Sequence, residues 1–147
     1  MSSDNVAGMQ AQHQILKESV NTVCESLNNG CTIDNLKNQL DDLASFLQAH
    51  CEEEEQLMRR YRYKGLNQHE KTHQSLISSL FSLRRQINKS LEEEQKKAIL
   101  NFLETDFMGH VVEDVETWQE GKMDRESVYR RLDDIARGAV NSNANAK

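Results

Sequence analysis

Four residues that can bind a metal ion form two pairs near the middle of the chain. His50 and Glu54 are four residues apart, and His69 and His73 repeat that spacing shortly afterwards. Residues four apart on an α-helix share one face, so each pair can reach a common point. Pairs on two helices joined by a short turn can converge between them, as in the metal sites of four-helix bundles. The spacing therefore indicates a non-haem metal centre inside a helical bundle.

Two further features extend this pattern toward both ends of the chain. His110 and Asp114 are another pair four residues apart, and His13 lies in an apolar seam near the N-terminus, so all five histidines fall on apolar seams. A single seam histidine is more often a satisfied core residue than a ligand. A metal-free bundle with histidines in its core is therefore an alternative. It would leave Glu54 buried and unpaired, at a cost of several kcal/mol.

The combined donor set suits two metal ions better than one. Imidazoles as terminal ligands and carboxylates as bridges fit two iron-sized ions. One zinc ion takes four ligands and would leave the other side chains unexplained. The predicted metal ligands are His13, His50, Glu54, His69, His73, His110 and Asp114.

The composition of the 147-residue chain is typical of an all-α protein. It contains no proline and six glycines, and 37% of its residues are hydrophobic, which favours long uninterrupted helices over a turn-rich β fold. We expect an antiparallel up-down four-helix bundle with a short C-terminal fifth helix. Residues 1–138 should form one domain, and the polar tail 139–147 should be disordered.

Apolar residues at steps of three and four predict the helices that position the ligands. Asn29-Gly30 is a stop signal, Asn67 is the expected N-cap of the third helix, and residues 90–93 resemble a capping box. Gly121 should close the fourth helix. The expected helix ranges are 4–28, 32–61, 67–88, 90–121 and 124–137.

The ionisable seam residues should meet at one end of the bundle. The seam of the second helix is apolar until it continues in phase with His50 and Glu54. The neighbouring Glu52, Glu53 and Glu55 fall off this seam and are expected to form a solvated acidic face. Up-down topology places the end of the second helix level with the start of the third. The predicted seam of the fourth helix is Leu100, Leu103, Phe107, His110, Asp114 and Trp118.

Charge and composition argue against several other classes of protein. The net charge of −6 disfavours nucleic acid as a partner, because duplex binding needs a concentrated basic surface. No apolar run approaches the roughly twenty residues of a membrane span, and the N-terminus lacks the blocks of a signal peptide. The three cysteines form no recognisable framework, so we expect reduced thiols in a cytoplasmic protein. Cys51 points about 100° away from His50 on a helix and should be inert.

The motifs in this chain resemble those of bacterial hemerythrins and hemerythrin-like di-iron proteins. The family's first motif places a His, a Leu and an Asn on one helix, which matches His13, Leu16 and Asn21. The second, His-x3-Glu-Glu-x2-Met-x4-Tyr, matches residues 50–63. The third, His-x3-His six residues after that Tyr, matches residues 69–73.

This resemblance covers about residues 9–118. It implies an oxo- or hydroxo-bridged pair of iron ions that binds O2 reversibly at one open position. The ligands that it implies are His69, His73 and His110 for one iron, His13 and His50 for the other, and Glu54 as a bridge.

The fourth motif departs from the family's usual pattern. That pattern has an aspartate five residues after the last histidine, where this chain has Val115. Asp114, four residues after His110, has the spacing of the broader hemerythrin-like group. On a helix a residue four positions on lies about 40° away, and one five positions on lies about 140° away. We therefore expect Asp114 to be the second bridge.

The resemblance implies a non-catalytic O2 carrier, store or sensor. Its expected partners are O2 and, for a sensor, a signalling output module; a homo-oligomer is also consistent with the sequence. The alternative is a di-iron redox enzyme or sensor that acts on peroxide or nitric oxide. A metal-free helical interaction module is the third reading.

Overall fold

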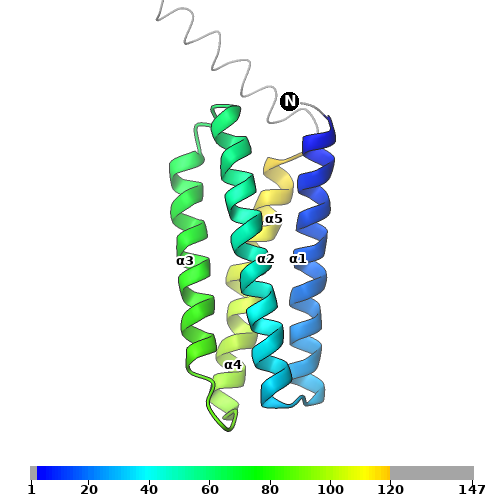
Figure 1. Cartoon of the computed structure of the whole chain (residues 1–147), viewed down its shortest axis with the longest axis vertical. Coiled ribbons are helices and arrows are strands. Elements are labelled where there is room, and N and C mark those ends of the chain that lie inside the picture. The colour runs from blue at the N-terminus through cyan, green and yellow to red at the C-terminus, as the bar shows by residue number, and fades with distance from the viewer. Residues whose placement is uncertain (1–2, 120–147) are drawn as a thin grey trace, which may run out of the picture.

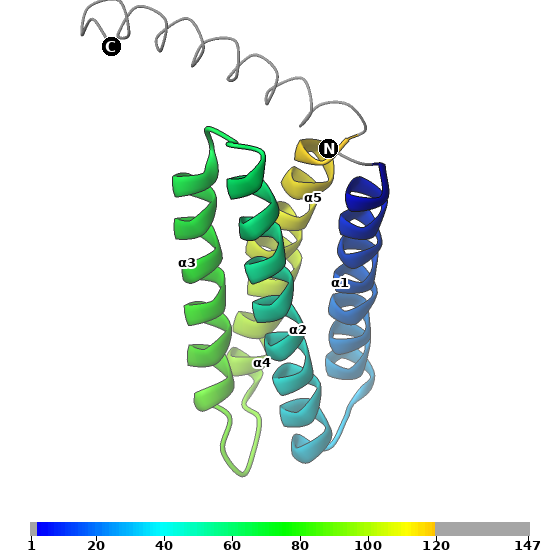
Figure 2. The ribbon, with the colours of Figure 1, turned by 45° about the horizontal axis from the view of Figure 1, so that its top comes forward.

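The computed structural model describes residues 3–119, which form an antiparallel up-down helical bundle (Figures 1 and 2). The last three elements form one continuous fourth helix, and residues 3–119 contain no strand. The predicted all-α four-helix bundle is confirmed. Gly121, the predicted fifth helix 124–137 and the tail 139–147 lie outside the described residues. The elements are α1 (Ser3–Asn29), α2 (Ile33–Arg60), α3 (Leu66–Arg85), α4 (Glu93–Asn101), η1 (Phe102–Phe107) and α5 (Met108–Thr117).

The predicted apolar seams form the bundle core. All seam positions of α1 from Met9 to Leu27 are buried, as are those of α2 from Leu36 to Leu57. The main core cluster joins these seams to those of α3 and the fourth helix. A second, smaller cluster consists of Met9, Leu57, Met58, Tyr61 and Trp118.

The connection between α1 and α2 follows the predicted signals. Gly30 has a φ of 86°, a left-handed conformation that glycine adopts without a Cβ clash. Thr32 then caps α2, because its hydroxyl oxygen accepts a hydrogen bond from the backbone N–H of Asn35 at 3.1 Å. These residues fix the first reversal of the chain.

The turn between α2 and α3 differs from the prediction. Asn67 is not the N-cap; Gly65 precedes the helix, and Asn67 lies within the first turn of α3. A Cβ at Gly65 would lie 2.5 Å from the ring of Tyr63. This turn therefore requires glycine at position 65, and Arg62 within it has a left-handed φ of 53°. The helix ends at Arg85, earlier than the predicted residue 88.

The capping box of α4 lies two residues later than predicted. Glu92 is the N-cap, and its backbone N–H donates to the Oε1 of Gln95 at 3.1 Å. The same Gln95 donates through Nε2 to the carbonyl of Gln86 at 2.9 Å. The capping box therefore forms at residues 92–95 and not at the predicted 90–93, because the side chains of Glu92 and Gln95 make the reciprocal hydrogen bonds.

The π-helix η1 changes the phase of the fourth helix. Ile99 is buried and Leu100 is only partly buried, so the predicted seam is wrong at Leu100. From Ile99 onward, buried residues recur in steps of four at 103, 107 and 111. Such steps drift by about 40° each on an α-helix, and the wider π turn absorbs this drift. The predicted positions from Leu103 onward are buried.

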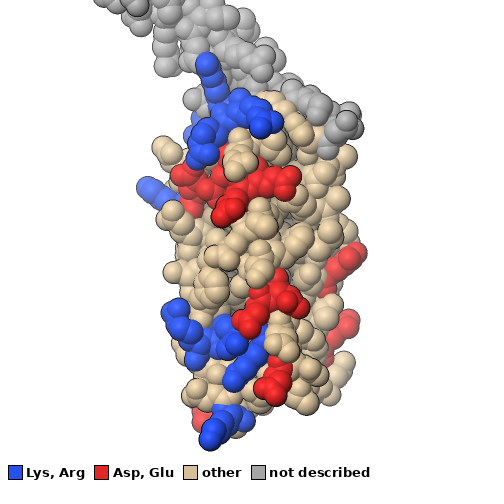
Figure 3. Space-filling model, viewed as in Figure 1, with Lys and Arg blue, Asp and Glu red and all other residues tan. Residues whose placement is uncertain are grey.

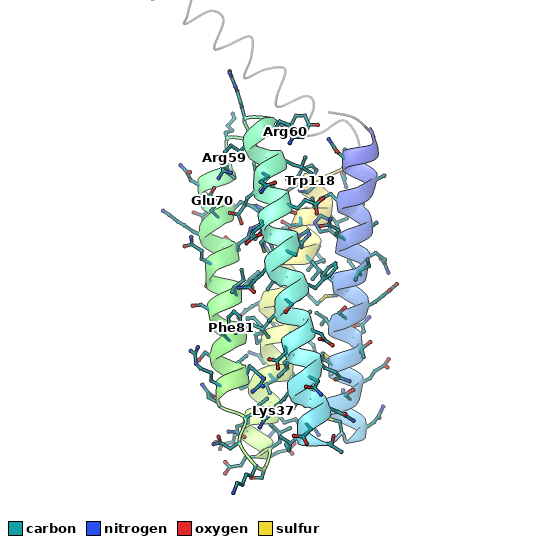
Figure 4. The ribbon with its side chains drawn as sticks, in the orientation of Figure 1. Lys37, Arg59, Arg60, Glu70, Phe81 and Trp118 are labelled. Atoms are coloured by element: carbon teal, nitrogen blue, oxygen red, sulfur yellow. The ribbon has the colours of Figure 1, made fainter. Side chains whose placement is uncertain are left out.

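The surface of the bundle carries both signs of charge. On the face in Figure 3, acidic and basic side chains lie next to one another toward both ends, with a band of largely uncharged surface between these two regions. Arg59 of α2 and Glu70 of α3 form an ion pair of 2.8 Å near the turn that joins these helices (Figure 4). Within residues 3–119, no helix has both the length and the apolar character required to span a membrane.

Candidate metal centre

All four helices of the bundle contribute to one cluster of ionisable side chains. Six of its seven members are buried, and the side chain of His69 is 13% exposed. The structure thus brings together every residue that the sequence predicted as a metal ligand; their ligation of a metal stays a prediction. The cluster consists of His13, His50, Glu54, His69, His73, His110 and Asp114.

The two carboxylate oxygens of Glu54 face different pairs of histidines. Its Oε2 lies 3.0 Å from the Nε2 of His13 and 3.4 Å from that of His50. Its Oε1 lies 3.0 Å from the Nε2 of His73 and also contacts the Nε2 of His69. Glu54 therefore occupies the middle of the cluster, with one oxygen on each side.

Asp114 enters the cluster from the opposite helix. Its Oδ2 lies 3.0 Å from the Nε2 of His110, and its Oδ1 lies 2.9 Å from the Nε2 of His69. The same Oδ2 is 3.7 Å from His13 and 3.8 Å from His50. Asp114 is fully buried, as expected from its helical spacing to His110. It touches both halves of the cluster.

The ligand atoms divide into two overlapping groups. Within each group, one ligand atom from every residue lies within 4.8 Å of the others. The two groups share Glu54 and Asp114 and no histidine. The larger group is Glu54, His69, His73, His110 and Asp114, and the smaller is His13, His50, Glu54 and Asp114.

The hydrogen bonding of the cluster fits a pair of metal ions. Within residues 3–119, the Nε2 atoms of His50, His73 and His110 and both carboxylate oxygens of Asp114 are buried, and they face other cluster atoms at 2.9–3.8 Å without the geometry of a hydrogen bond. Polar groups buried without well-formed hydrogen bonds are costly in a protein interior. Imidazole and carboxylate groups are suitable ligands for iron and similar ions. Metal ions between these atoms would satisfy them.

Three of the histidines are held by hydrogen bonds on their outer side. Each donates its Nδ1–H to a side-chain oxygen and turns its Nε2 toward the cluster. Outer partners of this kind fix the tautomer and the orientation of metal-binding histidines. The pairs are His13 with Gln10 at 2.8 Å, His50 with Gln12 at 2.8 Å and His73 with Glu55 at 2.7 Å.

The sequence analysis did not identify these outer partners. Gln10 also donates to the carbonyl of Val115 at 2.9 Å, and Gln12 to the Oε2 of Glu53 at 2.7 Å. Each glutamine therefore connects α1 to a second helix. Glu55, expected on a solvated face, is instead half-buried against the cluster. Its place beside Glu54 in the second motif was the available signal, whereas only tertiary structure reveals the two glutamines.

Buried carboxylates and imidazoles shift one another's pKa values. Burial lowers the pKa of His50, but the interactions with Asp114 and Glu54 outweigh this effect and raise it to about 9. The same balance raises the pKa of His69 to about 10. Burial raises the pKa values of Glu54 and Asp114, but the histidines lower both below the usual range. Without a metal ion, His50 and His69 therefore favour the protonated form, and Glu54 and Asp114 favour the ionised form.

Cys51 lies beside the cluster as a buried thiol. Its Sγ and ligand atoms of Glu55 and His73 lie within 4.8 Å of one another. Burial raises the pKa of Cys51, and the negative charges of Glu54 and Glu55 raise it further. A protonated thiol is a poor nucleophile, in agreement with the expected inert role.

Apolar side chains enclose the cluster along the bundle axis. The main core cluster begins one turn away on one side, at Leu16, Leu47 and Val111. The smaller cluster begins one turn away on the other side and contains Met9 and Trp118. Trp118 is fully buried within the bundle (Figure 4). The ionisable cluster is thus shielded from water at both ends.

Comparison with known proteins agrees with this geometry. The family model for hemerythrin, described as the hemerythrin HHE cation-binding domain, matches residues 4–119. No match was found among curated proteins or solved structures.

Proposed function

Because this chain belongs to the hemerythrin family of cation-binding domains, we propose that its seven-residue cluster holds two iron ions and binds O2 reversibly. The observation that carries this proposal is the division of the ligand atoms by Glu54. Its Oε1 faces His69 and His73, and its Oε2 faces His13 and His50. A carboxylate in that position can bridge two ions.

The unequal numbers of histidines support one open position. The larger group offers three histidines and the smaller group two, and both share the same two carboxylates. An ion held by the smaller group would have one more position free for an external ligand. Ferrous ions bound there would supply the electrons for reversible O2 binding. The resemblance of the motifs to hemerythrins supports O2 as that ligand.

The protein contributes orientation and exclusion of water. Gln10 and Gln12 hold His13 and His50 with Nε2 toward the centre and keep the proton on Nδ1. The apolar clusters at both ends of the site limit the access of water along the bundle axis. Glu54 and Asp114 supply two negative charges that would partly neutralise bound cations.

A test combines iron analysis with visible spectroscopy of the full chain. The proposal expects about two irons per chain and a visible band that appears on oxygenation of reduced protein and disappears when O2 is removed. Asp42→Asn, a surface substitution on α2 remote from the cluster, serves as the control. Absence of iron would overturn the di-iron proposal. Iron that oxidises in air with no reversible band would overturn reversible O2 binding.

The exposure of His69 favours a second candidate function. Its side chain is 13% exposed, unlike the other members of the cluster, so one side of the site can exchange with solution. A di-iron redox enzyme or sensor acting on peroxide or nitric oxide would use such access. Irreversible oxidation together with catalytic consumption of peroxide would favour this candidate over an O2 carrier.

A further inference from the structure

The space between α3 and the fourth helix forms a groove that reaches the metal centre. It has a volume of about 500 Å³ and extends to His110. Most side chains on its α3 wall are small or polar, and Gly109 and Thr105 leave the opposite wall open. The groove is also lined by Lys71, Ser75, Asp106 and Glu113.

Among residues 3–119, no outer side chain bridges the side of the centre where the groove lies. Gln12 connects α1 with α2 by donating to Glu53 and accepting from His50. Gln10 connects α1 with α5, and Glu55 connects α2 with α3. Within residues 3–119, α3 and α5 are joined at this level by the ion pair of His69 with Asp114, and both of these residues belong to the cluster itself. Three sides of the site are therefore secured, and the groove occupies the fourth.

Among the described residues, His110 on this side has no outer hydrogen-bond partner. Its Nδ1 is buried without a hydrogen-bond partner among the described residues, although His110 lines the groove. By contrast, His73 is held by Glu55 at 2.7 Å. A ligand without an outer partner keeps more freedom to turn. His110 can therefore move without breaking an outer hydrogen bond.

The helix backbone next to His110 is also weakly held. The π-helix η1 ends at Phe107, three residues before His110, and Gly109 directly precedes it. A Cβ at Gly109 would contact nothing within 4 Å. Glycine weakens a helix, and π turns interrupt the regular hydrogen-bond ladder. The helix is thus locally weakened where it carries this ligand.

The charges beside His110 favour a cation. Asp106 lies one turn before His110, and Glu113 lies almost one turn after it; both are exposed and line the groove. Lys71 is the basic residue on the facing wall. Like-signed charges that line a cleft raise the local concentration of the opposite ion. Asp106 and Glu113 do not belong to either compact ligand group, so an ion would pass them rather than stay.

We propose that this groove is the route by which a divalent metal ion enters and leaves the centre, drawn by Asp106 and Glu113 and admitted by rotation of His110. The proposal rests on the proposed function, because it requires a metal ion in the cluster. It concerns the rate of loading and release and leaves the final metal content unchanged.

The first test measures the uptake of Fe2+ by metal-free full-length protein under anaerobic conditions. The double variant Asp106→Asn/Glu113→Gln should take up Fe2+ roughly three- to tenfold more slowly at low ionic strength. Added salt should reduce the difference, since it screens exposed charges. The final iron content should equal that of the wild type.

A matched control separates the groove from net charge. Glu104→Gln/Glu116→Gln removes the same charge from η1 and α5, at exposed positions that do not line the groove. This variant should load at the wild-type rate. Equal slowing of both double variants, or slowing of neither, would overturn the proposed route. If wild-type protein takes up no Fe2+, the proposed function fails instead.

A second test blocks the groove without changing charge. Ser75→Trp places a large side chain in it, whereas Ser78→Trp places the same side chain on an exposed part of α3 outside it. From iron-loaded protein, a chelator should extract iron several-fold more slowly in the first variant only. Equal extraction rates in both variants would contradict the route.

Discussion

Glu54 is the residue on which the two halves of the site depend. It is fully buried and interacts with four histidines through two oxygens. The sequence identified it because a carboxylate interrupts an apolar seam in phase, and burial without partners would be costly. The same argument located all five histidines. The spacing along each helix was therefore sufficient to predict the cluster residues, because all of them lie on apolar seams.

We expect Glu54→Gln to lose the paired site. The substitution removes the negative charge and replaces one facing oxygen by an N–H2 group, which cannot ligate a metal. Iron content should fall from about two per chain to one or less, measured by elemental analysis. Glu52→Gln, at an exposed position on the same helix, should retain the wild-type content. Full iron content in Glu54→Gln would contradict a bridging role.

The outer partners are a second residue-scale test. Glu55→Leu removes the acceptor for the Nδ1–H of His73 and should weaken iron binding about 10- to 100-fold, measured by competition with a chelator. Glu55→Gln keeps an acceptor oxygen and should retain most of the affinity. These partners were not predicted, because they lie off the seam and meet the histidines only in the folded bundle. Similar losses in both variants would indicate that charge, not orientation, is what matters.

The shifted pKa values predict how the stability of the metal-free protein depends on pH. The lowered pKa values of Glu54 and Asp114 stabilise the fold above their unfolded values near 4, and this contribution is lost as pH falls. The raised values of His50 and His69, about 9 and 10, stabilise it fully below about 6.5. That second contribution is lost as pH rises through 9 and 10.

Urea unfolding of chelator-treated protein should therefore show highest stability between about pH 4.5 and 6.5, with a decline toward about pH 10. Loading with iron should remove the alkaline decline, because metal ligation requires deprotonated imidazoles. Stability of the metal-free protein that increases between about pH 7 and pH 9 would contradict the ion pairs at His50 and His69.

At the scale of the elements, periodicity predicted the four helices but not their irregularities. The regular three- and four-residue steps of α1 and α2 gave their buried faces correctly. The prediction was wrong at Leu100, because steps of three and four were assumed through a π turn where the buried positions follow steps of four. Asn67 was wrongly predicted as the N-cap of α3, because Gly65 precedes this helix. Long seams are encoded locally, whereas turns and bulges reflect tertiary packing.

Two glycines should respond in opposite ways to alanine. Gly109→Ala adds a Cβ in open space within α5 and should raise the free energy of unfolding by about 0.5–1 kcal/mol through helix propensity. Gly65→Ala places a Cβ 2.5 Å from the ring of Tyr63 and should lower it by about 1–3 kcal/mol. Urea denaturation at matched metal content measures both. A stabilising Gly65→Ala would contradict the described turn.

At the scale of the whole molecule, the bundle keeps ionisable groups away from its main core. The seven cluster residues lie between two apolar clusters, and the main core fills the rest of the interior. Up-down topology is sufficient to produce this segregation, because it aligns the end of α2 with the starts of α1 and α3 (Figure 1). The sequence therefore predicted the level of the site in the bundle as well as its residues.

This arrangement makes metal binding part of the stability of the fold. In the metal-free protein, several Nε2 atoms and the carboxylate oxygens of Asp114 are buried without well-formed hydrogen bonds, and metal ions would satisfy them. An ion that binds only the folded state at a free concentration a hundredfold above its Kd adds about 3 kcal/mol. For a chain of this size that corresponds to an increase in Tm of about 6–12 °C. Thermal unfolding with Fe2+ under anaerobic conditions, and again after chelation, measures the change.

Glu54→Gln supplies the comparison for this last prediction. It should respond less to Fe2+, because one oxygen that faces a histidine pair is lost, whereas Asp42→Asn on the surface of α2 should respond fully. An equal increase in Tm for all three proteins would mean that Fe2+ binds elsewhere. No increase in the wild type would show that the buried cluster tolerates its unpaired atoms without metal, and the bundle would then be a metal-free fold.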